Sequence, residues 1–318
     1  MKSATLRQIR IFACVAKHHS FARAAEELHL SAPAVSMQIK ELEGGSGLPL
    51  FERAGKGVRL TMPGEYLLVY ARRILATLKE AENVMAGLRG AQAGTMIVGM
   101  VSTAKYFLPR LLARFRAEHP AVEMRLSSGN REQLVRELRD NEVDLAVMGR
   151  PPRDLDTRAE PFAAHPLAII AAPGHALARG GIIAPKMLDA ESFIVREPGS
   201  GTRATMEHFF RDAHISPPIA MEMSSNETIK QAVIAGMGLA FVSLHTAALE
   251  LAVGQLVVLD VAGLPIMRRW HVVSIQGKPL SPAAEALRYF IIEQGEGLLA
   301  EQFGKSVPVG AAPSYGRT

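Results

Sequence analysis

Near the start of the chain, apolar side chains recur at intervals of three and four residues in two short segments. The first segment follows Ser20 and the second follows Ser31, and serine is a favoured residue at a helix N-cap. The apolar positions are, in order, Phe21, Ala24, Ala25 and Leu28, then Val35, Ile39 and Leu42. Pro33 falls in the first turn of the second segment, where a missing backbone N–H costs nothing. The pattern predicts two short helices joined by a tight turn.

The face of the second helix that lies opposite its apolar stripe carries small and polar side chains with a single charge. Such a surface can approach base edges closely in the major groove of DNA, and helix–turn–helix is a common docking unit for that purpose. An ordinary helical hairpin explains the same pattern, so the pattern alone does not distinguish a DNA-binding motif from a hairpin without that function. The candidate DNA-contacting residues of the two helices are Ser20, Ser31, Ala32, Pro33, Ser36, Met37, Gln38 and Lys40.

A β-hairpin is predicted directly after these helices, within residues 50–61. Two short β-like runs flank a tip formed by Gly55-Lys56-Gly57. The cations clustered around this tip are Arg53, Lys56 and Arg59. A basic hairpin beside a reading helix supplies a sequence-independent grip on phosphates. We therefore interpret the N-terminal segment as a winged helix-turn-helix and add these three cations to the candidate DNA contacts.

The net charge of +5 is confined to the first part of the chain. Residues 1–92 contain 13 Lys and Arg against 8 Asp and Glu, whereas the remaining residues contain 23 of each. A basic segment attached to a chain that is otherwise neutral is typical of a protein that binds a polyanion. Cys14 is the single cysteine, which excludes an internal disulfide and fits a reducing compartment. No apolar run could span a membrane and no secretory signal is evident, so we expect a cytoplasmic protein with no membrane partner.

A long helix is predicted from Glu65 to Arg89, where there is no proline and only one glycine. At 1.5 Å per residue it would be about 36 Å long. Its apolar residues alternate spacings of four and three, which is a heptad seam. The seam residues are Leu67, Ala71, Ile74, Leu78, Ala81, Met85 and Leu88. A second copy of the chain buries such a seam most simply, and a dimer suits the reading of paired half-sites. Packing onto the C-terminal domain is the alternative.

Strand-like and helix-like runs alternate after the short AQAGT segment at residues 91–95. This alternation predicts an α/β fold with parallel sheets covered by helices, and about 210 residues suggest two such lobes. The predicted organisation is a winged helix-turn-helix DNA-binding domain (1–62), a dimerisation linker helix (63–92), a two-lobed effector-binding domain (93–303) and a disordered tail (304–318).

Several predicted strands end in short polar stretches that each open a helix. Ligands of open α/β sheets bind beyond the carboxyl ends of the strands, and free N–H groups at helix starts bind anions. Plain N-capping explains any one stretch, whereas convergence on one crevice would form a carboxylate or phosphate site. The candidate effector-binding residues are Ser102, Thr103, Lys105, Asn130, Arg150, Ser200, Thr202, Arg203, Asn226 and Thr228. The alternative for Arg203 is an ion pair with Glu207 on its own helix.

Residues 5 to about 75 resemble the N-terminal signature of the LysR-type transcriptional regulators. The stretches that carry this resemblance are LRQIRIFACVAKHHSFARAAEELHLSAPAVSMQIKELE and GLPLFERAGKGVRLTMPGEYLLVYARRIL. The resemblance implies a two-lobed effector domain, similar to periplasmic binding proteins, with a small inducer between the lobes. Gly44-Gly45-Ser46 departs from the family pattern of helix formers. Since each glycine costs a helix interior about 1 kcal/mol, we expect the reading helix to fray or stop early there.

Three further stretches, VSTAKYFLPRLLARF, DLAVMGRPP and EPGSGTRATMEHFF, resemble regulators of Calvin-cycle carbon-fixation operons. This resemblance implies activation of the genes for ribulose bisphosphate carboxylase (RuBisCO), with phosphorylated metabolites such as phosphoenolpyruvate as signals. The implied partners are operator DNA, RNA polymerase and further copies of the chain in a homodimer or homotetramer. Control of another metabolic operon is the alternative.

Two other classes of protein are less well supported. The histidines, cysteine and carboxylates show no metal-ligand spacing, and no nucleophile or dinucleotide-binding motif stands between a strand and a helix. We therefore expect no catalytic residue, no metal and no cofactor. A solute-binding transport protein would explain the C-terminal lobes but not the basic N-terminal segment.

Overall fold

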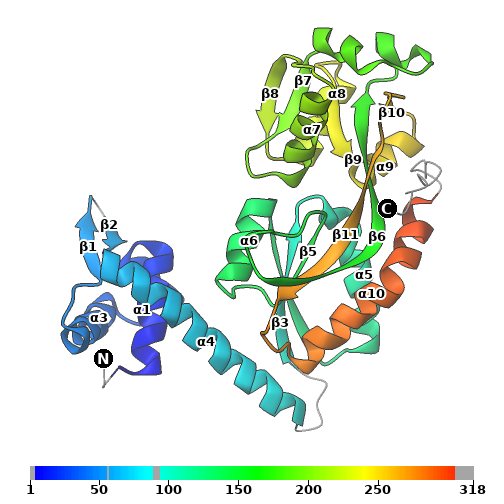
Figure 1. Cartoon of the computed structure of the whole chain (residues 1–318). Helices are drawn as coiled ribbons and strands as arrows, with labels where there is room; N and C mark the ends of the chain where they lie inside the picture. Colours follow the sequence, from blue (N-terminus) through cyan, green and yellow to red (C-terminus); the bar gives the residue numbers. More distant parts are fainter. Residues whose placement is uncertain (1–3, 56, 89–93, 305–318) are drawn as a thin grey trace. The chain divides into compact units, whose positions relative to one another are not determined.

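The structure is a computed structural model that describes residues 4–55, 57–88 and 94–304 (Figure 1). By its internal contacts the chain divides into two compact units, with the division near residue 90. Among the described residues, no helix is long and apolar enough to cross a membrane. Three expectations fall wholly or mostly outside the described residues, namely those on Lys56, on the linker at 91–95 and on the tail at 304–318.

The N-terminal unit forms the helices and the hairpin that the pattern predicts. Ser20 caps its helix by accepting a hydrogen bond from the N–H of Arg23, and Ser31 caps the next by accepting from that of Ala34. The two apolar stripes meet in a core that also holds Phe12. The elements are α1 (Leu6–His18), α2 (Phe21–Glu27), α3 (Ala32–Ser46), β1 (Phe51–Ala54) and β2 (Gly57–Leu60).

The reading helix α3 does not stop early, and that expectation is wrong. The helix runs through both glycines to Ser46 and ends at Gly47, which has a left-handed φ of 72°. The carboxylate of Glu43 accepts hydrogen bonds from the backbone N–H groups of Leu50 (2.8 Å) and Phe51 (3.3 Å). These bonds tie the last turn of α3 to the start of the hairpin, and they offset the low helix propensity of glycine.

Helix α4 (Met62–Leu88) is continuous, as predicted. The first two seam residues, Leu67 and Ala71, are buried in the core of the N-terminal unit. The apolar side chains that α4 leaves more than one-third exposed include Met62, Tyr66, Val69, Tyr70, Ile74 and Met85. We call these six residues the α4 stripe. Ile74 and Met85 belong to the predicted seam and stay exposed, whereas the other four residues of the stripe lie outside it. The exposed surface therefore matches the predicted seam only in part, because the unit's own core takes Leu67 and Ala71.

One seven-stranded sheet forms the framework of the C-terminal unit. Its order is β10-β6-β11-β5-β3-β4, and β9 also pairs with β6. Strands β3, β4 and β5 are parallel, whereas β6 and β11 are antiparallel to each other and to their other neighbours. The expectation of parallel sheets therefore holds for β3, β4 and β5 but is wrong for the strands that pair with β6 and β11. The strands are β3 (Gly94–Val101), β4 (Val122–Gly129), β5 (Leu145–Met148), β6 (Thr157–Ala171), β9 (Ala240–Ser243), β10 (Val257–Val258) and β11 (Ile266–Ile275).

The C-terminal unit has two lobes joined by β6 and β11. Figure 1 shows these strands running side by side from the region of β3 and β5 to the region of β7 and β10. A second sheet pairs β7 (Phe193–Arg196) with β8 (Ile219–Met223) in parallel. The helices are α5 (Leu108–Glu118), α6 (Arg131–Arg139), α7 (Gly201–Asp212), α8 (Asn226–Ile234), α9 (Leu244–Ala252) and α10 (Pro282–Phe303). The first lobe contains β3, β4 and β5, and the second contains β7, β8 and α7.

Candidate functional site

The outward face of α3 is exposed along its whole length. Val35 and Ile39 point into the core, and the side chain of Met37 on the opposite face is 56% exposed. The other exposed candidates on this face are Ser31, Ala32, Pro33, Ser36 and Lys40. Gln38 and Ser20 are half-buried. The structure therefore presents the predicted reading residues on one continuous, weakly charged surface.

The hairpin that follows α3 along the chain carries Arg53 and Arg59, and both are exposed. Arg59 forms an ion pair with Glu52, its direct partner on the neighbouring strand, at 2.7 Å. Part of the positive charge predicted for the hairpin is therefore neutralised. The hairpin packs closely against the end of α1, because a Cβ atom at Gly57 would lie 2.7 Å from the carbonyl oxygen of His19. Glycine at this position allows the close approach.

One group of described residues brings three possible metal-binding atoms within 4.8 Å of one another, namely Cys14, His18 and Glu27. The carboxylate is already engaged, since Glu27 lies 2.9 Å from Lys17 Nζ and 2.5 Å from His18 Nε2. These two hydrogen bonds lower the pKa of Glu27. Burial raises the pKa of the Cys14 thiol, which disfavours the thiolate that metals bind. The group is explained as a polar contact between α1 and α2.

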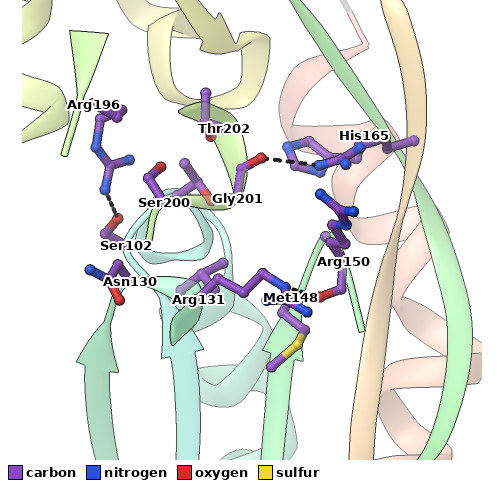
Figure 2. Close-up of a pocket in the computed structure, with 14 residues that line it drawn as sticks. Ser102, Asn130, Arg131, Met148, Arg150, His165, Arg196, Ser200, Gly201 and Thr202 are labelled. Atoms are coloured by element: carbon purple, nitrogen blue, oxygen red, sulfur yellow. Dashed lines mark hydrogen bonds between the residues drawn. The ribbon is translucent and has the colours of Figure 1, made fainter. Parts of the chain in front are cut away.

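A pocket lies in the C-terminal unit where the carboxyl ends of β3, β4 and β5 face the start of α7 (Figure 2). About 370 Å³ of space in it is not filled by protein atoms, and this volume includes the solvent at its mouth. The first lobe contributes Ser102, Thr103, Asn130, Arg131, Gly149 and Arg150. The second lobe contributes Arg196, Ser200, Gly201 and Thr202. The two strands that join the lobes contribute His165 from β6 and Arg268 from β11.

Four arginines line this pocket, and among the described residues no Asp or Glu does so. Arg131 donates to the backbone carbonyls of Arg150 (3.0 Å) and Pro151 (3.3 Å), and Arg268 donates to that of Gly201 (3.3 Å). Carbonyl partners orient these guanidinium groups but do not cancel their charge. Burial, together with the charges of Arg150 and Arg131, lowers the pKa of Arg268 to about 10. An anion bound between these arginines would offset both the cost of burying Arg268 and its repulsion by Arg131 and Arg150.

Arg196 is fixed between the two lobes. Its side chain is buried, and it donates to Asn226 Oδ1 at 2.9 Å and to Ser102 Oγ at 3.0 Å, the second of which is drawn in Figure 2. It also pairs with Glu197 at 2.8 Å. Because Ser102 belongs to the first lobe, Arg196 connects the lobes at the pocket, and its charge is shared with a carboxylate behind it.

The structure brings together six of the ten predicted effector residues. Those that line the pocket are Ser102, Thr103, Asn130, Arg150, Ser200 and Thr202. Asn226 is buried behind the lining, where its amide supports Arg196. Lys105 and Thr228 are exposed and outside the lining. The ammonium of Lys105 instead lies 5.1 Å from the centre of the Tyr106 ring.

Arg203 also lies outside the pocket lining. Its guanidinium pairs with Glu207 on the same helix at 2.8 Å and with Glu222 on β8, and it donates to the carbonyl of Arg196 at 2.9 Å. The hydrogen bonds to both carboxylates raise its pKa. The alternative of an ion pair with Glu207 is therefore what the structure shows, and Arg203 helps to hold the strand end that carries Arg196.

Sequence reasoning missed four pocket residues that can bind an anion, namely Arg131, His165, Arg196 and Arg268. Arg131 directly follows Asn130, and Arg196 ends a strand, so the rule that polar strand ends form the site could have found both. His165 and Arg268 lie within strands and face each other across the β6–β11 pair. No local signal marks them, because only the pairing of two distant segments brings them together.

Comparison with protein families gives the class of this protein. Residues 89–296 match the LysR substrate binding domain, and residues 6–65 match the bacterial regulatory helix-turn-helix protein of the lysR family. The chain belongs to the LysR family of transcriptional regulators, as the sequence resemblance predicted. The predicted sequence of parts, a helix-turn-helix followed by a two-lobed α/β effector domain, is confirmed.

Individual relatives show which regulators of this family the chain resembles. The chain is 49% identical over 308 residues to the HTH-type transcriptional regulator CfxR of Cupriavidus necator, which covers 97% of each protein. It is 48% identical over 290 residues to the RuBisCO operon transcriptional regulator of Allochromatium vinosum, covering 91% of this chain and 96% of that one. The solved structure of the Synechocystis CcmR regulatory domain in complex with 2-PG is 38% identical, with a TM-score of 0.60, and covers 63% of this chain and 97% of that one.

Proposed function

We propose that this regulator activates carbon-fixation genes, those for RuBisCO and its neighbours, in response to an anionic, phosphorylated metabolite. The observation that carries the proposal is the pocket between the lobes, which is lined by four arginines and no described carboxylate. The similarity to the RuBisCO operon transcriptional regulator of Allochromatium vinosum, at 48% identity along nearly the whole chain, supports the choice of target genes. The alternative target is another metabolic operon of the same general kind.

The pocket suits a small phosphorylated acid for physical reasons. Arg131, Arg150 and Arg268 supply positive charge, and charge-assisted hydrogen bonds from guanidinium groups to phosphate are among the strongest in proteins. The start of α7 adds free backbone N–H groups and the hydroxyls of Ser200 and Thr202. The related CcmR domain was solved with 2-PG, which is consistent with this class of ligand. A phosphoenolpyruvate-like molecule is the effector that we propose.

On the DNA side, we propose that the exposed face of α3 reads bases and that the hairpin binds phosphates. The small side chains of Ala32 and Ser36 and the exposed apolar side chain of Met37 allow base contacts, whereas Arg53 and Arg59 provide charge. Lys56 belongs to the same proposed grip but lies outside the described residues. The chain would work in the cytoplasm as a homodimer or homotetramer, and it would activate transcription through contact with RNA polymerase.

The target genes can be tested by selection of genomic DNA. Purified full-length protein should retain fragments that lie upstream of carbon-fixation genes from a library of its own genome. Retention of fragments upstream of an unrelated operon would assign the chain to that operon instead. Retention without any preference would contradict sequence-specific regulation.

The division of labour on the DNA side predicts two different mutant behaviours. Ser36→Ala should reduce discrimination between operator and random DNA by about 1–3 kcal/mol for each lost base contact. Arg53→Ala should weaken binding to both DNAs alike and lower the slope of affinity against salt concentration by about one unit. Gel-shift titrations on both DNAs at several salt concentrations measure these effects. If Arg53→Ala altered only discrimination, the assignment of helix and hairpin would be reversed.

A further inference from the structure

His165 is the one uncharged, fully buried ring in the wall of the proposed effector pocket. Its side chain is 3% exposed, and neither ring nitrogen has a hydrogen-bond partner among the described residues. Gly149 makes room for it, since a Cβ atom there would lie 2.5 Å from the Nδ1 atom of the ring. Buried polar groups are normally paired, so an unpaired imidazole at a pocket wall points to a ligand atom as its partner.

The charges around His165 are all of one sign. Arg268 lies directly opposite on β11, His271 lies three residues further along that strand, and His245 faces the ring from α9. Arg150 follows β5 at the same pocket, and the residues that α7 contributes to the pocket are uncharged. Burial holds the pKa of His165 well below its ordinary value. The positive charge of Arg268, and that of His245 or His271 when protonated, acts in the same direction. Without an anion the ring is therefore neutral.

We propose that His165 is a proton-linked contact of the effector, neutral in the ligand-free chain and bound to the anion as imidazolium. The proposal rests on the proposed function of the pocket and adds how that site selects its ligand. A phosphate or carboxylate beside the ring supplies the negative charge that the surroundings lack, which favours the protonated form. The proton comes from solvent, and it converts the second ring nitrogen into a donor. A ligand with a full negative charge at this point is thereby preferred over a neutral one of the same shape.

The direction of the pH dependence follows from linkage. An anion raises the pKa of His165, so the complex binds one proton more than the free chain between the two pKa values. In that interval the dissociation constant falls as pH falls, by at most about tenfold per unit of pH. Binding of the anion is therefore tighter in mildly acidic than in mildly alkaline solution.

The fluorescence of a tryptophan beside this ring can report the protonation of His165. Trp270 is the only tryptophan, and its indole stacks on His165 with ring centres 3.8 Å apart and an interplanar angle of 16°. Its Nε1 donates to His245 Nδ1 at 3.1 Å. An imidazolium ring stacked on an indole quenches its fluorescence by accepting an electron from the excited state, whereas neutral imidazole quenches weakly. Emission from Trp270 thus responds to the protonation of His165, and a variant at His245 separates any response to that second histidine.

The experiment uses full-length protein and inorganic sulfate, whose own charge does not change from about pH 6 to about pH 9. Sulfate should quench Trp270, and its dissociation constant should rise by about tenfold or more across this range. His165→Gln should bind sulfate with little pH dependence and without the quench. His245→Gln is the matched control, because it changes the other histidine at Trp270 but not the pocket lining, and it should retain the pH dependence.

Calorimetry of the wild type in two buffers with different heats of ionisation provides a measurement that needs no variant. Uptake of close to one proton per bound sulfate is expected at mildly acidic pH, between the pKa of His165 in the free chain and that in the complex, and less uptake is expected at alkaline pH. Binding without proton uptake, or an unchanged pH dependence in His165→Gln, would overturn the role of His165 and leave the anion pocket standing. Failure of wild type to bind either sulfate or phosphoenolpyruvate would overturn the proposed function itself, and the proton-linked contact with it.

Discussion

Arg268→Met is expected to weaken binding of phosphoenolpyruvate by roughly 30-fold to 1,000-fold, while affinity for DNA stays near that of the wild type. Removal of one partner of a desolvated charge contact costs about 2–4 kcal/mol. Arg268 is such a partner, because it is half-buried among like charges and is held by a carbonyl rather than a carboxylate. Its loss relieves the repulsion from Arg131 and Arg150, so the free protein should fold normally.

Titration calorimetry of full-length wild type and variant measures this effect, with pyruvate as the matched ligand that lacks the phosphate. Arg179→Met is the control variant, since Arg179 is an exposed arginine of the second lobe that lies outside the pocket lining. It should bind phosphoenolpyruvate as the wild type does. If both variants lost affinity equally, the pocket would not be the effector site, and a general loosening of the second lobe would explain the result.

Ile74→Asp is expected to convert the regulator into a monomer and to abolish operator binding at concentrations where the wild type binds. The side chain is 42% exposed in the single chain and lies in the α4 stripe, which we propose to be buried against a second copy. An unpaired carboxylate in such an interface costs at least about 3 kcal/mol, or roughly 100-fold in association. Loss of the dimer also removes the paired half-site contacts.

Light scattering should show a mass near 34.4 kDa for this variant and at least twice that value for the wild type. Ile74→Leu keeps the apolar surface and should remain associated. Leu67→Asp should act by a different route and unfold the N-terminal unit, because Leu67 lies in the core of that unit. An Ile74→Asp protein that stayed dimeric would mean that the α4 stripe is not the interface.

The N-terminal module was predictable because its signals are local. Serine caps, a proline in the first turn and apolar residues three and four apart are all visible within a window of one helix. The apolar surface that α4 leaves exposed was harder to predict. The spacing of the predicted seam is regular, but the sequence does not show that the unit's own core takes Leu67 and Ala71, and this choice decides which face remains exposed.

The pocket was only half predictable, and β6 is the reason. Pro161 and Pro166 interrupt this segment, and proline inside a run argues against a central strand. The prolines are tolerated because β6 pairs at both positions with β11 alone, and pairs with β9 and β10 only from Leu167 onward. A register shift next to Pro161, between Trp270 and His271, also accommodates the break. Without β6 there is no reason to place His165 opposite Arg268. Arg203 was wrongly assigned to the pocket. It pairs with Glu222 on β8, and the sequence does not reveal this contact.

The central claim is that an anion in this pocket changes the affinity for DNA, and one coupled titration tests it most directly. The affinity of full-length protein for its selected operator fragment is measured with and without saturating phosphoenolpyruvate or 2-PG, and the affinity for the metabolite is measured with and without DNA. We predict that at least one of the two metabolites changes DNA affinity by about tenfold, or 1.4 kcal/mol, and that DNA changes the affinity for that metabolite by the same factor. DNA affinity that is identical with and without both metabolites would contradict the account.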